Sequence, residues 1–348
     1  MKRIWLFFPL LLSGQCNRTQ PVASASIQAL HATQRICGLT LVAPPEPFPQ
    51  NPMPAVQSAG ANWIAVVPYA YTMPGKPAVR YNEHGWQWWG EKPEGSLATI
   101  EMAHRAGIKV MLKPQVYVPG GWTGTLDFEL PEEWAAWEAG YSAYILQMAR
   151  LADTTGVELF CIGTEFRTAI SKRPAYWIDL IQQIRTVYPD GKLVYSSNWD
   201  DWDQVPFWDR LDYIGLGAYF PMIDDDLPTV DNLLGAWKPM CKQLGEFSNL
   251  HQKPVLFTEY GYLSVDGCGG KNWELENNIK ARNINETAQA NCYEALFRAC
   301  MHEPWWAGGF TWKWFPNGQG HEGYPERDYT PQGKKAEAVL RKWYSTMQ

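Results

Sequence analysis

Short apolar runs alternate with segments of helical periodicity along residues 34–348 of the 348-residue chain. Apolar runs rich in β-branched and aromatic residues are typical of buried parallel strands. Eight such runs occupy residues 36–42, 61–69, 109–117, 157–165, 193–198, 213–219, 254–259 and 308–314. Apolar positions at helical spacing lie between and after them, at residues 97–106, 132–152, 174–188, 233–247, 286–302 and 334–344. This alternation predicts an α/β protein with a single-domain (β/α)8 TIM barrel.

A doubly wound open sheet is the competing fold for the same alternation. That fold usually carries a glycine-rich first turn that binds a nucleotide, and the sequence contains no G-x-G-x-x-G or P-loop motif. The barrel therefore accounts for the pattern better. It also fixes where an active site is expected, because catalytic residues of this fold lie at the carboxyl ends of the strands.

Two of the predicted strands end in the same dipeptide, Thr-Glu followed by an aromatic residue. These ends place Glu165 at the last position of the fourth strand and Glu259 at the last position of the seventh. A carboxylate closing a buried apolar run is poorly explained by core packing. We therefore expect Glu165 and Glu259 to face one site at the barrel mouth. The alternative is that either acid only forms an ion pair with a basic neighbour such as Lys113 or Arg167.

Other polar and aromatic residues are expected at the same level of the barrel. Alternation along the third strand puts Lys113, Gln115 and Tyr117 on one face, and alternation along the eighth does the same for Trp312 and Trp314. Residues predicted to bind substrate are Lys113, Gln115, Asn198, Tyr219, Trp312, Trp314, Trp88, Trp122 and Trp199.

Composition narrows the chemistry at this mouth. The net charge is −6 and no basic run is present, which argues against a nucleic-acid partner. No cysteine or histidine pattern has metal-ligand spacing, so neither a metal nor another cofactor is expected. The 19 tryptophans include clusters in loops, and flat apolar rings beside carboxylates suit the C–H faces of sugars. Two carboxylates flanking a sugar-binding cleft are the minimal equipment for glycosidic bond hydrolysis.

The N-terminus has the pattern of an export signal. A positive start, Met1-Lys2-Arg3, precedes an apolar run that is too short to cross a bilayer. We expect residues 1–15 to be a signal peptide, residues 16–33 a flexible tether and residues 34–348 the catalytic domain. Cys16 is the candidate for lipidation, as in bacterial lipoproteins, although Gln15 stands where that pattern prefers a small residue. The expected location is the outer side of the membrane, either anchored through the lipid or secreted without one.

The chain resembles glycoside hydrolase family 113 over residues 36–320. The segments that carry the resemblance are residues 66–69, 113–116, 160–165, 212–215, 257–262 and 308–314. The family implies a (β/α)8 barrel, a retaining mechanism and β-1,4-mannan as substrate. By this resemblance Glu165 would be the acid/base, Glu259 the nucleophile and Tyr219 the tyrosine that hydrogen-bonds the nucleophile. The wider clan has Asn before the acid/base where this chain has Thr164, so Asn198 is the candidate to hold the sugar 2-hydroxyl.

The leading hypothesis is a retaining endo-β-1,4-mannanase that acts on β-mannan or glucomannan as a monomer. Two alternatives remain open from the sequence. One is an exo-acting β-mannosidase, or a hydrolase that trims oligosaccharides or cuts another β-glycan. The other is a catalytically inactive glycan-binding protein at the cell surface, which would not require both acids.

Overall fold

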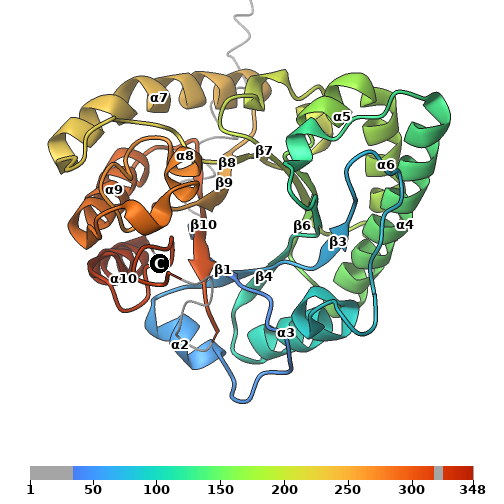
Figure 1. Ribbon diagram of the computed structural model, residues 1–348, viewed down its shortest axis with the longest axis horizontal. Helices are drawn as coiled ribbons and strands as arrows, with labels where there is room; N and C mark the ends of the chain where they lie inside the picture. The colour runs from blue at the N-terminus through green and yellow to red at the C-terminus, as the bar shows by residue number, and fades with distance from the viewer. Residues whose placement is uncertain (1–33, 317–323, 348) are drawn as a thin grey trace, which may run out of the picture.

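The computed structural model describes residues 34–316 and 324–347, so the predicted signal peptide, tether and Cys16 lie outside the described residues. Eight parallel strands close into a barrel in the order β1-β10-β9-β8-β7-β6-β4-β2, ringed by helices (Figure 1). The predicted TIM barrel is confirmed. Its strands are β1 (Ile36–Leu41), β2 (Trp63–Val66), β4 (Lys109–Leu112), β6 (Leu159–Thr164), β7 (Lys192–Ser197), β8 (Ile214–Gly217), β9 (Val255–Tyr260) and β10 (Trp306–Trp314).

The predicted second and third strands each divide into two. Past Pro68 and Pro114 the chain continues as β3 (Tyr69–Tyr71) and β5 (Gln115–Tyr117), which pair with each other outside the barrel. The reason is local, because proline has no N–H to donate to a ladder. This small sheet continues β2 and β4 beyond their carboxyl ends, on one side of the barrel mouth.

The helices follow the predicted positions with shifted ends. The α-helices are α2 (Met53–Ser58), α3 (Pro93–Arg105), α4 (Pro131–Thr155), α5 (Arg167–Lys172), α6 (Pro174–Val187), α7 (Val230–His251), α8 (Asn272–Glu276), α9 (Glu286–Cys300) and α10 (Lys335–Met347). Short 3-10 helices are η2 (Trp89–Glu91), η3 (Thr123–Thr125), η4 (Trp202–Gln204), η5 (Trp208–Arg210) and η6 (Ile279–Ala281). Proline opens α3, α4 and α6, where its missing N–H has no helical partner to lose.

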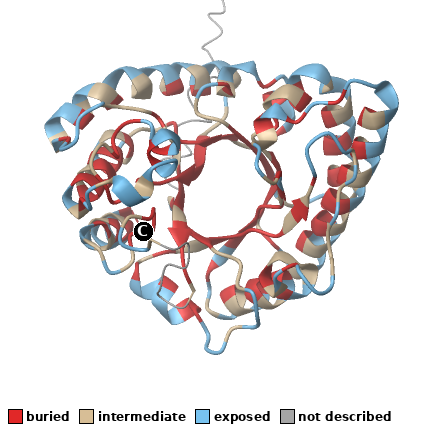
Figure 2. Ribbon diagram, in the orientation of Figure 1, coloured by how far each residue is buried: buried red, intermediate tan, exposed pale blue. Residues whose placement is uncertain are grey.

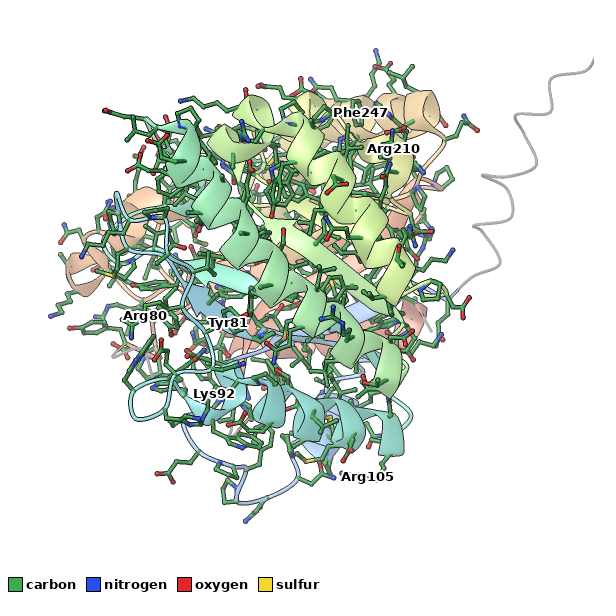
Figure 3. All side chains as sticks on the ribbon, turned by 90° about the vertical axis from the view of Figure 1, so that its right-hand side faces the viewer. Arg80, Tyr81, Lys92, Arg105, Arg210 and Phe247 are labelled. Carbon is green, nitrogen blue, oxygen red and sulfur yellow. The ribbon has the colours of Figure 1, made fainter. Side chains whose placement is uncertain are left out.

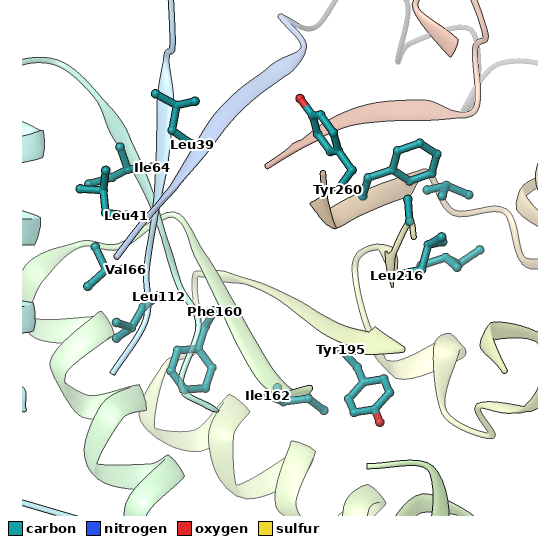
Figure 4. Close-up of a cluster of buried hydrophobic side chains, with 14 of the residues drawn as sticks. Leu39, Leu41, Ile64, Val66, Leu112, Phe160, Ile162, Tyr195, Leu216 and Tyr260 are labelled. Carbon is teal, nitrogen blue, oxygen red and sulfur yellow. The ribbon is translucent and has the colours of Figure 1, made fainter. Parts of the chain in front are cut away.

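Side chains of the strands alternate between two apolar layers. On β6, Leu159 and Cys161 belong to a small cluster with residues of the other strands, while Phe160 and Ile162 belong to the large cluster that packs under the helices. Figure 4 shows part of the large cluster, including Phe160 and Ile162. The ring of strands is buried, and the helices expose their outer faces (Figure 2). This arrangement leaves the carboxyl ends of the strands as the place for polar chemistry.

The long loop after β3 packs on the outside of the barrel beside α4. Tyr81 lies against Tyr144 with ring centroids 5.0 Å apart, and Asn82 donates a hydrogen bond to Gln147 at 3.3 Å. Figure 3 shows this side of the molecule, with Arg80 and Tyr81 on the loop. The loop then returns to the mouth, where it brings Trp86 and Trp88 beside β3. Among the described residues, no helix is long and apolar enough to cross a membrane.

Candidate active site

Two adjoining pockets lie at the carboxyl ends of the strands. The first, here the carboxylate pocket, has a volume of about 220 Å³ and is lined by both predicted acids, Glu165 and Glu259. The second, here the tryptophan pocket, has a volume of about 450 Å³ and is lined by Trp86 and Trp88. The two pockets share the walls formed by Tyr69, Tyr117 and Trp312. Together they make one continuous binding surface.

Glu259 reaches the carboxylate pocket because β9 contains one additional residue near its end. Leu216 of β8 pairs with Phe257, but the next residue, Gly217, pairs with Glu259. A bulge of this kind shifts the alternation by one residue and can turn a side chain toward a site. Without it, Glu259 would follow Phe257, which packs in the large apolar cluster.

Three donors hold the Glu259 carboxylate. Gln115 donates to Oε1 at 2.9 Å, Tyr219 donates to Oε2 at 3.0 Å, and the Lys113 ammonium also contacts Oε1. Lys113 is fully buried and Glu259 is 8% exposed. Burial lowers the pKa of Lys113 to about 8, while the nearby Cys161 and Glu165 act in the opposite direction. This environment stabilises Glu259 as an anion.

Glu165 lies across the pocket in a different environment. Its backbone adopts φ of +57°, in the left-handed region that non-glycine residues rarely occupy. β6 also carries an additional residue, because Cys161 pairs with Val194 and Thr164 with Ser196. Thr164 and Glu165 therefore both border the carboxylate pocket, which strict alternation does not allow.

In the described part of the chain, one side-chain donor forms a hydrogen bond with the Glu165 carboxyl. The indole N–H of Trp122 donates to Oε2 at 2.6 Å. Burial raises the pKa of Glu165; the Trp122 hydrogen bond and the charges of Lys113 and Arg167 lower it, whereas Asp201 raises it further, and the net pKa is above the usual value. The two acids are therefore differentiated: Glu259 is held as a carboxylate, and Glu165 is biased toward its protonated form.

Trp312 and Trp314 do not share a face, so the prediction that both bind substrate is wrong for Trp314. Leu39 of β1 pairs with Thr311 and Leu41 with Trp314, which leaves one additional residue in β10 between these pairs. Trp312 borders both pockets, whereas Trp314 is 3% exposed and packs in the large apolar cluster. The bulge reverses the direction expected from alternation.

The remaining predicted residues divide into two groups. Lys113, Gln115 and Tyr219 meet at Glu259, Trp88 borders the tryptophan pocket, and Trp122 borders the carboxylate pocket. Asn198 and Trp199 are not among the described residues that line these pockets. Asn198 donates to Asp200 at 2.9 Å, and Trp199 stacks on Trp273 with centroids 5.4 Å apart.

Several residues of the site were not singled out by the sequence. Tyr71 and Glu91 face the tryptophan pocket, where the tyrosine hydroxyl donates to Glu91 Oε2 at 2.8 Å. Burial raises the pKa of Glu91, and the Tyr71 hydrogen bond acts in the opposite direction. Glu91 lies in η2, and no local sequence pattern distinguishes it from the neighbouring acids Glu83 and Glu94. In the described parts of the chain, no group of three or more His, Cys, Asp or Glu residues could hold a metal ion.

The sequence model of glycoside hydrolase family 113 matches residues 47–334. A search of curated proteins found no significant match. Among solved structures, the chain is similar to the GH113 β-mannanase AaManA from Alicyclobacillus acidocaldarius in complex with ManMIm, with 30% identity and a TM-score of 0.78 over 91% of this chain and 99% of that one.

A second similar structure is a complex of a GH113 β-1,4-mannanase, with 25% identity and a TM-score of 0.72 over 90% of this chain and all of that one. A β-glucuronidase from Ruminococcus gnavus is 15% identical, with a TM-score of 0.62 over 90% of this chain and 50% of that one, and shows a likeness of fold only. The match to the family model spans most of the chain, and the barrel agrees with the fold of the two similar mannanase structures. The chain belongs to glycoside hydrolase family 113 and is a glycoside hydrolase.

Proposed function

We propose that this glycoside hydrolase is a retaining endo-β-1,4-mannanase, in which Glu259 is the nucleophile and Glu165 the acid/base. The observation that carries the proposal is the asymmetry of the two carboxyls in one pocket. Glu259 is held by an ammonium, an amide and a phenol, which suits an anion that attacks the anomeric carbon. Glu165 has a raised pKa, which suits a group that must be protonated when the reaction starts.

The steps follow from these environments. Glu165 donates its proton to the glycosidic oxygen as Glu259 attacks the anomeric carbon, and the leaving sugar departs as an alcohol. Glu165, now a carboxylate, takes a proton from water, and the resulting hydroxide displaces Glu259 from the sugar. Two inversions retain the configuration. Lys113 remains beside Glu259 throughout and stabilises its charge before attack and after release.

The tryptophan pocket supports action inside a polymer. It continues the carboxylate pocket past Trp312, and it presents the rings of Trp86 and Trp88, each 45% exposed, to a further part of a chain of sugars. Aromatic faces of this kind bind sugar rings through their C–H surfaces. Mannan as the polymer is supported by the family and by the two mannanase structures described above.

The chemical roles can be tested by azide rescue. Glu259→Ala should lose turnover, and azide should restore it with a glycosyl azide of inverted configuration. Glu165→Ala with an activated aryl β-mannoside should give the azide of retained configuration. Inverted product from wild-type enzyme, or full activity of Glu259→Ala, would contradict the assignment.

Product analysis tests substrate and mode of action. Mannan, glucomannan, cellulose and short manno-oligosaccharides should be compared by chromatography of early products. An endo-acting mannanase releases oligosaccharides of mixed length from mannan. Release of mannose alone would favour the exo-acting β-mannosidase, and cleavage of cellulose in preference to mannan would indicate another β-glycan. Calorimetric binding of mannan without reducing-sugar release would favour a catalytically inactive glycan-binding protein.

We also propose that the chain is exported, lipidated at Cys16 and monomeric. The support for export and lipidation is the N-terminal sequence pattern described above. Incorporation of labelled palmitate into the wild-type protein, lost in Cys16→Ala together with membrane association, is the expected result. An unlabelled wild-type chain in the soluble fraction would support secretion instead. Sedimentation equilibrium of the mature domain should give a mass of one chain.

A further inference from the structure

Trp122 contacts the reacting carboxyl rather than only forming a wall for sugar. Its indole N–H lies 2.6 Å from Glu165 Oε2. An indole N–H can donate a hydrogen bond but cannot accept one. Oε2 is therefore the accepting oxygen in both protonation states. The carbonyl oxygen of a carboxylic acid accepts better than its hydroxyl oxygen, which favours Oε1 as the site of the proton in the acid form.

We propose that Trp122 is a positioning residue that fixes the Glu165 carboxyl so that Oε1 carries the transferred proton. This inference rests on the proposed role of Glu165 as acid/base. In the first step the proton leaves Oε1 for the glycosidic oxygen. In the second step Oε1 takes a proton back from the attacking water. Oε2 keeps its hydrogen bond throughout, and that bond strengthens when the carboxylate forms.

The Trp122 ring is held between two groups. The Arg167 guanidinium lies over the ring, 4.9 Å from its centroid. Gly124 also packs against the Trp122 ring. A Cβ at this position would lie 2.3 Å from an indole carbon, so only glycine permits this packing. Thr125 donates a hydrogen bond to the Trp122 carbonyl at 2.8 Å, which fixes the backbone.

Arg167 is itself anchored. Its Nε donates to Asp201 at 2.8 Å, and it also contacts Asp200. Asp201 is buried and accepts the backbone N–H of Asn198 at 2.9 Å. A chain of contacts thus runs from the loop after β7 through Arg167 and the indole to the acid. This chain gives Asn198, predicted to bind substrate, a structural role at its outer end.

The charged and titratable groups around Glu165 come from several strands and loops of the barrel mouth. Lys113, which follows β4, Arg167 (α5) and the Trp122 N–H favour the carboxylate, whereas Asp201 disfavours it. Glu259 (β9) borders the same pocket, and the neutral hydroxyls of Tyr195 (β7) and Tyr219 also lie near the carboxyl. Of these, Trp122 is the one for which a single substitution, Trp122→Phe, removes the donor and keeps a ring beneath Arg167.

The test compares two substrates. Trp122→Phe should lower kcat/KM for unactivated manno-oligosaccharides roughly 10- to 100-fold, the worth of one hydrogen bond to a charged group. It should leave kcat/KM for a 2,4-dinitrophenyl β-mannoside nearly unchanged, because that leaving group needs no proton. The basic limb of the pH profile for kcat/KM should move to higher pH, because loss of the donor destabilises the carboxylate.

Trp134→Phe is the matched control. Trp134 also donates its indole N–H, to the Phe128 carbonyl at 2.9 Å, and lies under an arginine, but it sits on α4 outside both pockets. In this variant, neither the dependence of kcat/KM on the leaving group nor the basic limb of its pH profile should change. Gly124→Ala is a second route to the same result, because the added methyl must displace the Trp122 ring.

Equal losses on both substrates with an unshifted basic limb would overturn the inference and make Trp122 a sugar-binding wall. Unchanged kinetics would overturn it as well. Glu165→Ala separates this inference from the proposed function, since it must show the same dependence on leaving group. If Glu165→Ala lacks that dependence, the acid/base assignment fails; if only Trp122→Phe and Gly124→Ala lack it, the role of Trp122 fails.

Discussion

The phenolic hydroxyl of Tyr219 donates a hydrogen bond to Oε2 of Glu259 at 3.0 Å. Tyr219 follows β8 and Glu259 lies near the end of β9, so two neighbouring strands supply the tyrosine and its acceptor. The resemblance to the family implied this pairing, and the structure confirms the contact. It leaves Oε1 of Glu259 to Lys113 and Gln115.

Tyr219→Phe should lower kcat/KM on mannan roughly 10- to 100-fold, because a hydrogen bond to a charged group is worth about 1.5–3 kcal/mol. The ring stays in place, so the melting temperature should change little. Tyr213→Phe is the control, since Tyr213 immediately precedes β8, at the end of that strand opposite Tyr219. Comparable losses in both variants would show that the effect is not specific to Glu259.

Glu165→Gln should stabilise the protein at neutral pH by about 0.5–2 kcal/mol, as expected where an active-site charge is held at a cost in stability. The pKa of Glu165 is raised in the folded state, so between its unfolded and folded values the folded protein binds more protons. Stability of the wild type therefore falls as pH rises through that window.

Urea denaturation of wild type and Glu165→Gln as a function of pH measures this effect. The two proteins should be closest in stability below the unfolded pKa, where Glu165 is neutral in both states, and should differ by a constant amount above the folded pKa. A difference that grows as the pH falls would contradict the assigned direction of the shift.

Trp312→Ala and Trp314→Ala should separate binding from folding. Trp312 borders both pockets, so its loss should reduce kcat/KM by about 10-fold with a small change in melting temperature. Trp314 is buried in the core, so its loss should cost about 3–5 kcal/mol of unfolding free energy. Thermal melts and kinetics of the two variants check this. A large loss of stability in Trp312→Ala together with a loss of activity alone in Trp314→Ala would contradict the directions assigned to the two side chains.

Trp88→Ala should affect long substrates more than short ones. We expect kcat/KM for longer manno-oligosaccharides to fall about 10-fold, since one stacking ring is removed from the tryptophan pocket. An aryl mannoside that fills only the carboxylate pocket should be cleaved at the wild-type rate. Leu130→Ala, an exposed apolar residue before α4, serves as control. Equal losses for all substrate lengths would place Trp88 at the reacting sugar.

The order of the elements was predictable because hydrophobic periodicity is a local property. The barrel, the strands that carry the acids and the positions of Glu165 and Glu259 all follow from it. Two-residue alternation also predicted that Lys113 and Gln115 share a face, and in the structure both contact Glu259. The breaks at Pro68 and Pro114 could have been read from the absence of a proline N–H.

By itself, then, the sequence determined the fold and the strand ends at which the chemistry lies. Only the tertiary structure decided where side chains point at those ends, because β6, β9 and β10 each carry an additional residue there. Such a bulge shifts the two-residue period by one, which turns Glu259 into the pocket and Trp314 into the core. Its presence depends on pairing with neighbouring strands, and no local pattern of hydrophobic residues encodes that. The same holds for Trp122, whose contact with Glu165 joins two loops 43 residues apart.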